Sequence, residues 1–263
     1  PNNLGNYTKI GNDELYTARA TKDLMYWDDK GVPAYLLNKA NSVATNNIGT
    51  WIVAGGSLYD GTDVSKNCMV ISPDNCVNWE ELSKVGDIFT EVKDIKYVND
   101  HWIAVGYGPN NNAIATSTDG RNWTAQSYPL TVSAEDAVLN SVVWTGTRYL
   151  IAGKYNSGGG IFYSNDYSGN WTAVAPNDDI SGVTEILSIA NKGDREILIS
   201  ANSPSGISKL WYSKSFGGVG SWKPVTILEN TNYLSDVKHI KYNEGVFYAS
   251  GSIGTDSVNK TTS

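Results

Sequence analysis

The heptapeptide Ser117-Thr118-Asp119-Gly120-Arg121-Asn122-Trp123 decides the fold, because the chain repeats its pattern at nearly regular intervals. Three related stretches end in Trp79, Trp171 and Trp222, so consecutive tryptophans lie 44, 48 and 51 residues apart. An internal period of this length is typical of solenoids and propellers, in which one structural unit is copied along the chain. We call each stretch a box; the recurring residues are Ser72, Asp74 and Trp79; Ser117, Asp119 and Trp123; Ser164, Asp166 and Trp171; and Ser213 and Trp222.

A fifth, degraded box is expected near the start of the chain, at Trp27–Gly31, with Pro33 near the expected place of its tryptophan. Between the boxes a second element recurs, an apolar run that ends in a small residue. The register of the repeat is supported by Val92–Tyr97 and Val237–Tyr242, which agree at five of six positions. The five apolar runs are 51–55, 102–106, 149–153, 197–201 and 247–251.

Each repeat unit predicts four short antiparallel strands, joined by turns rich in Gly, Asn and Asp. In one unit the strands are expected at about 92–98, 102–106, 113–117 and 123–127. No stretch shows helical periodicity. A sheet of this size cannot bury both faces alone, so its copies must pack against one another, and radial closure achieves this. The sequence therefore predicts an all-β protein, a β-propeller of four-stranded blades.

The box has a local role in the turn between the third and fourth strands of a blade. An Asp or Ser two residues after the first Ser accepts backbone N–H bonds, Gly relieves the turn, and Trp covers it. The pattern Ser-x-Asp-x-Gly-x-x-Trp resembles the Asp-box, or BNR repeat, of sialidases, sortilin-type receptors and many bacterial and phage surface propellers. The resemblance covers residues 13 to about 251. It implies a fold and leaves the function open, because such propellers host many activities.

Residues 1–263 are expected to form one domain, and the number of its blades is the open question. Five blades result if N-terminal strands at about 24–37 pair with C-terminal strands at about 237–251 and close the ring. Six result if the tail, which ends in Ser263, adds another strand. We favour five, because the tail has Lys260 where four other copies have an apolar residue. The start lacks an initiator Met and a signal-peptide pattern, so a domain excised from a longer protein is expected.

Composition excludes several classes of partner. The formal net charge is −7 and the pI is near 4.8, without a Lys/Arg cluster, so we expect no nucleic-acid partner. No run approaches the roughly 18 apolar residues that cross a bilayer, and membrane insertion is not expected. Cys68 and Cys76 flank a predicted turn, so both a disulfide and two separate thiols remain open.

Catalytic chemistry finds little support in the residue pattern. A sialidase needs an arginine cluster, a Tyr nucleophile with a Glu partner, and an acidic acid/base. Three of the four arginines, Arg121, Arg148 and Arg195, are expected at the end of the propeller that carries the boxes, opposite the catalytic end in that family. His101 and His239 lack further ligands at metal-binding spacing. We therefore expect no metal and no cofactor, and no carboxylate pair stands out.

The loops opposite the boxes are the expected ligand-binding end, because the connections from second to third strands emerge there. Tyr, Asn and Asp in these loops combine flat apolar faces with directional hydrogen bonds, which suits glycans and surface proteins. We expect a non-enzymatic recognition module on an extracellular or virion surface, such as a phage tail. The alternatives are a glycoside hydrolase on the same fold, or a structural propeller that assembles with other subunits. The candidate ligand-binding residues are Tyr59, Asp60, Tyr107, Asn110, Tyr155 and Asn156.

Overall fold

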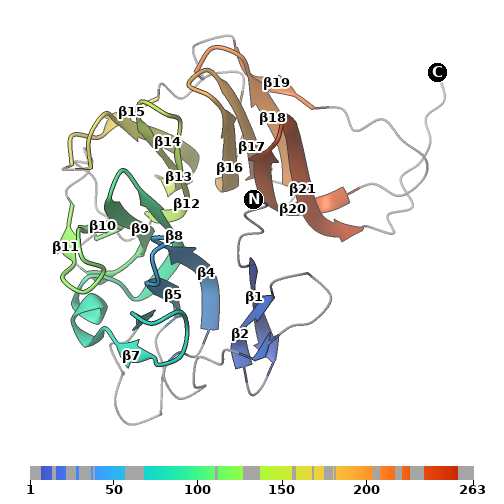
Figure 1. Ribbon diagram of the computed structural model, residues 1–263. Helices are drawn as coiled ribbons and strands as arrows, with labels where there is room; N and C mark the ends of the chain where they lie inside the picture. The colour runs from blue at the N-terminus through green and yellow to red at the C-terminus, as the bar shows by residue number, and fades with distance from the viewer. Residues whose placement is uncertain are drawn as a thin grey trace, which may run out of the picture.

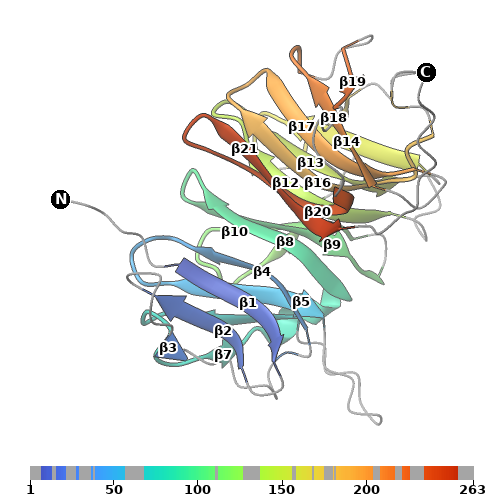
Figure 2. The same ribbon diagram turned by 90° about the vertical axis from the view of Figure 1, so that its right-hand side faces the viewer.

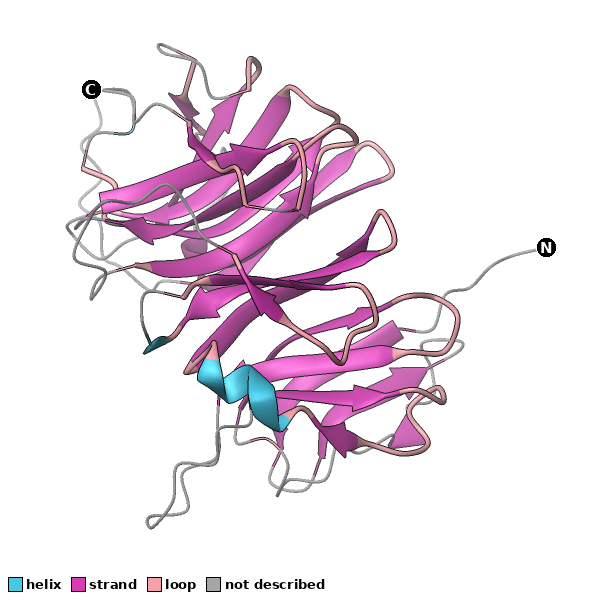
Figure 3. Ribbon diagram, turned by 90° about the vertical axis from the view of Figure 1, so that its left-hand side faces the viewer, coloured by secondary structure: helices cyan, strands magenta, loops and turns pink. Residues whose placement is uncertain are grey.

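The described part of the chain is built almost entirely from β-strands in the computed structural model (Figure 3). The described part also contains a five-residue 3-10 helix, η1 (Ser83–Asp87). No helix in that part is long and apolar enough to span a membrane. The structure describes residues 7–13, 16–21, 28–29, 37, 39–56, 68–109, 112–126, 137–155, 158–167, 169–174, 180, 182–203, 208–216, 221–225 and 234–253.

The strands form six consecutive groups, which lie around an open arc (Figure 1). They are β1 (Tyr7–Asp13), β2 (Tyr16–Thr21) and β3 (Asp28–Asp29); β4 (Lys39–Thr45), β5 (Trp51–Gly56), β6 (Met69–Ser72) and β7 (Glu80–Glu81); β8 (Glu91–Val98), β9 (His101–Tyr107), β10 (Ile114–Ser117) and β11 (Thr124–Ala125); β12 (Val138–Trp144), β13 (Tyr149–Tyr155), β14 (Gly158–Ser164) and β15 (Thr172–Ala173); β16 (Glu185–Lys192), β17 (Glu196–Asn202), β18 (Ser208–Ser213) and β19 (Lys223–Pro224); and β20 (Leu234–Asn243) with β21 (Val246–Ile253).

Four of these groups are four-stranded antiparallel units, as the repeat predicts. We call their strands A to D in chain order; the A strands lie innermost and the two-residue D strands lie at the periphery (Figure 1). The β4–β7 and β8–β11 units join into one eight-stranded sheet through a single bridge between Gly56 and Glu91. The described chain is therefore all-β, with sheets arranged radially.

A constant register relates the B and C strands of the units. The first residue of the apolar run in each of these B strands pairs with the box serine, as in Trp51 with Ser72 and Trp102 with Ser117. In the N-terminal group Tyr7 pairs with Thr21 in the same way. This register identifies β1, β2 and β3 as B, C and D strands.

The same register corrects the position of the first box. In the sequence Trp27 follows Thr21 by six residues, as Trp123 follows Ser117, so the box begins at Thr21. The expected box at Trp27–Gly31 was therefore placed six residues too late. A Thr in place of Ser, and the lack of a following Gly, concealed the copy.

The pairing expected to close the ring is not present among the described strands. Asp28 and Asp29 pair with β2, and β20 pairs with β21 alone in the described part of the chain. The remaining residues of the segment expected to close the ring, at 24–27 and 30–36, are outside the described residues, apart from the buried Leu37. A gap separates β20–β21 from β1–β3 (Figure 2). The count of five blades stays a prediction.

Small residues at the end of the B strands are explained by a close approach of two backbones. A Cβ added to Gly55 would lie 1.6 Å from the Lys39 carbonyl oxygen, and one added to Gly106 would lie 2.1 Å from the Glu91 carbonyl oxygen. Each paired A strand has a β-bulge beside this position, which brings its backbone inward. Glycine is needed there for space, since neither residue has a positive φ.

The core lies between successive sheets, where apolar side chains from facing strands interdigitate. Ile52, Ile71 and Trp102 belong to one such cluster, and the box residue Trp123 packs against it.

The exposure of the B strand is very different in the C-terminal group. Tyr248 of β21 is 55% exposed, whereas its counterpart Ile52 in β5 is fully buried. Among the described strands, no C strand pairs with β21.

Cys68 and Cys76 are both buried, and no disulfide joins them. Of the two possibilities that the sequence leaves open, the structure has separate thiols. Burial raises the pKa of the Cys68 thiol to about 12.

Candidate functional site

The innermost strands surround a cavity of about 570 Å³. All five A strands, β4, β8, β12, β16 and β20, contribute to its wall (Figure 1). Because the same strand positions recur in each unit, the lining residues fall into three tiers along the axis. In each A strand the residue at the bulge belongs to the rim tier. The residue that follows it belongs to the middle tier, and the residue two positions after that one belongs to the inner tier. The tiers are Asn41, Lys93, Asn140 and Leu187; Ser42, Asp94, Ser141, Ser188 and His239; and Val143, Ala190, Lys96 and Lys241.

The middle tier joins neighbouring units by hydrogen bonds. The Ser42 hydroxyl accepts the Ile95 N–H at 3.3 Å, and Asp94 Oδ2 accepts the Val142 N–H at 3.0 Å. The two following units repeat this contact: Ser141 accepts from Ile189 at 3.3 Å and Ser188 accepts from Ile240 at 3.1 Å. Each acceptor thus satisfies the backbone of the next A strand. We call these four contacts the inter-blade belt.

At the rim tier, Glu91 gathers donors from two neighbouring units. Its Oε1 accepts from Lys39 and Lys93 at 2.9 Å each and from Asn41 at 2.7 Å. Tyr107, at the end of β9, donates its hydroxyl to Oε2 at 3.3 Å. Burial raises the pKa of Glu91, but the hydrogen bonds from the lysines and Asn41 outweigh it and lower the pKa to about 2. Glu91 is therefore ionised at neutral pH.

A second contact of the same design occurs two units further on. Asn140 donates to Glu185 Oε1 at 2.8 Å and to the Ile186 carbonyl at 2.9 Å. Asn41 makes the equivalent pair of bonds, to Glu91 and the Val92 carbonyl. At both places an asparagine at the bulge of one A strand holds the start of the next. The rim of the cavity is thus fixed by polar side chains.

The cavity contains a single described carboxylate, Asp94, and its oxygens are fully engaged. Oδ1 accepts from Ser42 at 2.8 Å and from Lys96 at 2.5 Å, while Oδ2 accepts the backbone contact of the belt. Among the described residues no group of three or more His, Cys, Asp and Glu is placed to hold a metal ion. The described lining offers hydrogen bonds and charge, and lacks a second carboxylate facing the first.

Most of the residues expected to bind a ligand cannot be placed: Tyr59, Asp60, Asn110 and Asn156 are outside the described residues. Tyr107 belongs to the Glu91 cluster at the rim. Tyr155 instead packs edge-on against Phe162, with ring centroids 5.6 Å apart, and borders a separate apolar cavity of about 70 Å³. The two tyrosines thus belong to different clusters.

Sequence reasoning missed the middle tier. A signal for it is present, because a polar residue recurs at the same position of each A strand when the units are aligned. Serines are common throughout the chain, so this signal becomes visible only once the bulges fix the alignment. The residues are Ser42, Asp94, Ser141, Ser188 and His239.

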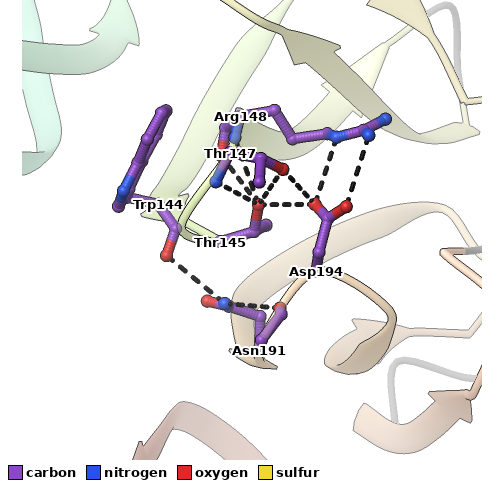
Figure 4. A network of polar contacts seen from close by, with 7 residues as sticks. Trp144, Thr145, Thr147, Arg148, Asn191 and Asp194 are labelled. Atoms are coloured by element: carbon purple, nitrogen blue, oxygen red, sulfur yellow. Dashed lines mark hydrogen bonds and ion pairs between the residues drawn. The ribbon is translucent and has the colours of Figure 1, made fainter.

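In the turns between A and B strands, a second polar network connects two units (Figure 4). Asp194 Oδ1 accepts from Thr145 at 2.8 Å and from Thr147 at 2.6 Å, and lies 3.1 Å from Arg148 Nε. The Arg148 guanidinium lies 4.4 Å from the centroid of the Phe216 ring. This network clamps the β12–β13 turn to the β16–β17 turn, so Arg148 has a structural role.

Arg121 also makes a contact between two units. Arg121 pairs with Glu80 through Nη1 at 2.5 Å and Nη2 at 3.1 Å. Neither Arg121 nor Arg148 lines the cavity. The described part of the cavity wall therefore holds lysine in place of arginine.

The box turn at Ser117–Trp123 has the hydrogen bonds that its sequence predicts. Asp119 Oδ1 accepts the N–H groups of Arg121 at 2.7 Å and Asn122 at 2.8 Å, and Ser117 accepts the Gly120 N–H at 2.9 Å. Hydrogen bonds from the Asn122 backbone are the largest cause of the lowered pKa of Asp119. The Trp123 indole donates to the Gly120 carbonyl at 2.9 Å. These residues build the turn.

No protein-family model and no curated protein sequence matches the chain. Solved structures do match it. A GH74 xyloglucanase from Xanthomonas campestris has a TM-score of 0.51 at 10% identity, over 81% of this chain and 43% of that one. A putative gluconolactonase has a TM-score of 0.53 at 12% identity, over 89% and 78%. A Trypanosoma rangeli sialidase, solved with the inhibitor DANA, has a TM-score of 0.53 at 13% identity, over 94% and 49%.

At these identities the comparison concerns the fold alone. The chain spans less than half the length of the xyloglucanase and the sialidase. The radial sheets, the inner A strands and the structural neighbours agree, and the chain has a β-propeller fold.

Proposed function

We propose that this chain is an Asp-box propeller that binds glycans without cleaving them, on an extracellular or virion surface. Its binding site is the cavity between the A strands, entered at the end that carries Tyr107 and Glu91. The Asp-box assignment is supported by the turns at Asp74 and Asp119, in which one carboxylate oxygen accepts two successive N–H groups. The surface location follows from the resemblance of the box to those of surface propellers.

The observation that carries the proposal is the state of the acidic groups around the cavity. Glycoside hydrolysis commonly needs a protonated carboxyl group as acid, with a second carboxylate about 5–10 Å away. Glu91 is held ionised by its donors, and Asp94 has no free oxygen. Such groups serve as hydrogen-bond acceptors rather than as catalytic acids.

The remaining lining suits saccharides. Asn41 and Asn140 contribute amides and Ser42 and Ser141 contribute hydroxyls to a wall that also contains aliphatic side chains. A cavity of about 570 Å³ falls in the usual range for small-molecule sites, which combine apolar surface with a few polar groups. Glycan binding uses both, since sugars present apolar faces and hydroxyl edges.

A glycan microarray with the purified chain tests the proposal, followed by saturation-transfer NMR on the glycans it retains. We expect Tyr107→Ala to weaken binding at least tenfold, because the ring borders the rim and its hydroxyl holds Glu91. Arg121→Ala is the matched control at the opposite end, and its affinity should stay within twofold of wild type. Release of reducing sugar from a bound glycan would refute a non-enzymatic role. Equal loss of binding in both variants would refute the location of the site.

A further inference from the structure

The charge of the cavity is opposite to that of the molecule. The whole chain carries 20 Lys and Arg against 27 Asp and Glu, a formal charge of −7. The described cavity lining has three lysines, Lys93, Lys96 and Lys241, and one carboxylate, Asp94. Its formal charge is therefore +2 with His239 neutral. The neighbouring pair of Lys39 and Glu91 cancels and leaves this balance unchanged.

Lys241 is the cation without compensation. Lys93 is paired with Glu91 and Lys96 with Asp94, whereas Lys241 has no acidic partner within ion-pair distance in the described part of the chain. Lys96 and Lys241 occupy equivalent positions in the inner tier, so both lysines border the same space. A cavity with low-dielectric walls strengthens the field of such a charge.

Apolar side chains share the cavity wall with these lysines and with several polar residues. Val143, Ile189 and Ala190 line the cavity beside them, and Ile240 precedes Lys241 in β20. The ammonium group of a lysine that faces such a cavity stays hydrated unless a ligand provides an anionic group that replaces the water. The side-chain N–H groups of Asn41 and Asn140 already donate to neighbouring strands, and their side-chain carbonyl oxygens have no donor in the described part of the chain and can accept from hydroxyl groups of the same ligand.

We propose that the cavity takes an anionic saccharide, with its carboxylate or sulfate group bound by Lys241 and Lys96. This inference rests on the glycan-binding function proposed above and names the chemical class of the ligand. Asp94 stays anchored by Ser42 and by the backbone contact of the belt, so Lys96 stays in place beside it. The asparagines of the rim tier bind the neutral part of the sugar.

Isothermal titration calorimetry with three oligosaccharides of equal length tests the inference: an oligogalacturonate, a sulfated glycosaminoglycan fragment and a neutral cello-oligosaccharide. We expect at least one anionic probe to bind tenfold or more tightly than the neutral one. Its affinity should fall severalfold between 50 and 300 mM NaCl, because salt screens the attraction (roughly 10 Å Debye length at 0.1 M). Comparison of the two anionic probes separates carboxylate from sulfate recognition.

Two substitutions locate the contact. Lys241→Met should weaken the anionic probe at least tenfold, and Lys241→Arg should retain most of the affinity. Lys223→Met is the control, since Lys223 is an exposed residue of the peripheral strand β19 and does not line the cavity. Equal melting temperatures of the variants establish that they fold.

The outcomes distinguish the two proposals. Tight, salt-insensitive binding of the neutral probe alone would overturn the anionic ligand and preserve glycan binding. Failure of all three probes, together with a blank microarray, would overturn both. An anionic probe whose affinity is unchanged in Lys241→Met would overturn the assignment of Lys241.

Discussion

Gly55 and Gly56 are adjacent in β5, and the structure predicts opposite responses when each is replaced by alanine. A Cβ at Gly55 would lie 1.6 Å from the Lys39 carbonyl oxygen and 2.6 Å from its carbonyl carbon. A Cβ at Gly56 would meet Lys39 Cβ at 3.6 Å, which is ordinary contact. Neither residue has a positive φ, so the backbone conformation admits alanine at both.

The magnitude follows from the displacement that alanine requires. Ordinary contact begins at 3.4 Å, so β4 and β5 must separate by about 1.8 Å near Gly55, against a normal spacing of about 4.8 Å between paired strands. The atoms in the way are backbone, which cannot turn aside. Overpacking of this kind costs about 1–3 kcal/mol, and we expect the upper end. For a chain of this size that lowers the melting temperature by about 6–12 °C.

Calorimetry and urea unfolding of Gly55→Ala and Gly56→Ala measure the difference. We expect Gly56→Ala to match or slightly exceed wild-type stability, because alanine restricts the unfolded chain. Equal melting temperatures for the two variants would refute the close approach at the bulge. A large loss in both would show that β5 rejects any side chain at its end.

Three further predictions follow from single contacts. Glu91→Gln should lower the free energy of unfolding at pH 7. The folded pKa of about 2 lies below the ordinary value of 4.5, so Glu91 stabilises the fold above pH 4.5. In urea titrations the difference in stability between wild type and variant should vanish as the pH falls to about 2. Ser188→Ala leaves the buried Ile240 N–H without its acceptor, at a cost of about 1–3 kcal/mol, and that amide should exchange faster by NMR; unchanged exchange would contradict the belt. Cys68 and Cys76 should resist a thiol reagent at pH 8 in the native protein and both react in denaturant without a reductant; one or no reactive thiol would contradict the structure.

The repeat allowed the radial all-β fold to be predicted, because each box fixes a turn by local chemistry. Asp119 binds N–H groups within three residues of itself, so its sequence neighbours alone determine the outcome. The N-terminal copy escaped because Tyr7–Gly11 includes the polar Thr8 and Lys9, and because Thr21 replaces the box serine. There the register is visible only in the strand pairing.

The site was harder to predict, because it depends on contacts between units. Ser42 and Asp94 are 52 residues apart and meet only when two A strands pack around the axis. Tyr155 was expected in a pore-lining loop, but β13 extends through it to pair with Gly158, so it is a strand residue that packs on Phe162. Side-chain direction after a bulge cannot be derived from spacing alone.

Because of the inter-blade belt, the arrangement of the units around the axis does not depend on the segments that connect their strands. Donor and acceptor of each contact both lie in A strands, so the angular step between neighbouring units is set beside the axis. Connections between B and C strands differ greatly in length, from 12 residues (57–68) to two (156–157), while the belt contact recurs in each unit. If the arc is set by contacts between A strands, then a change in the length of a connection between B and C strands should leave the step between neighbouring units unchanged.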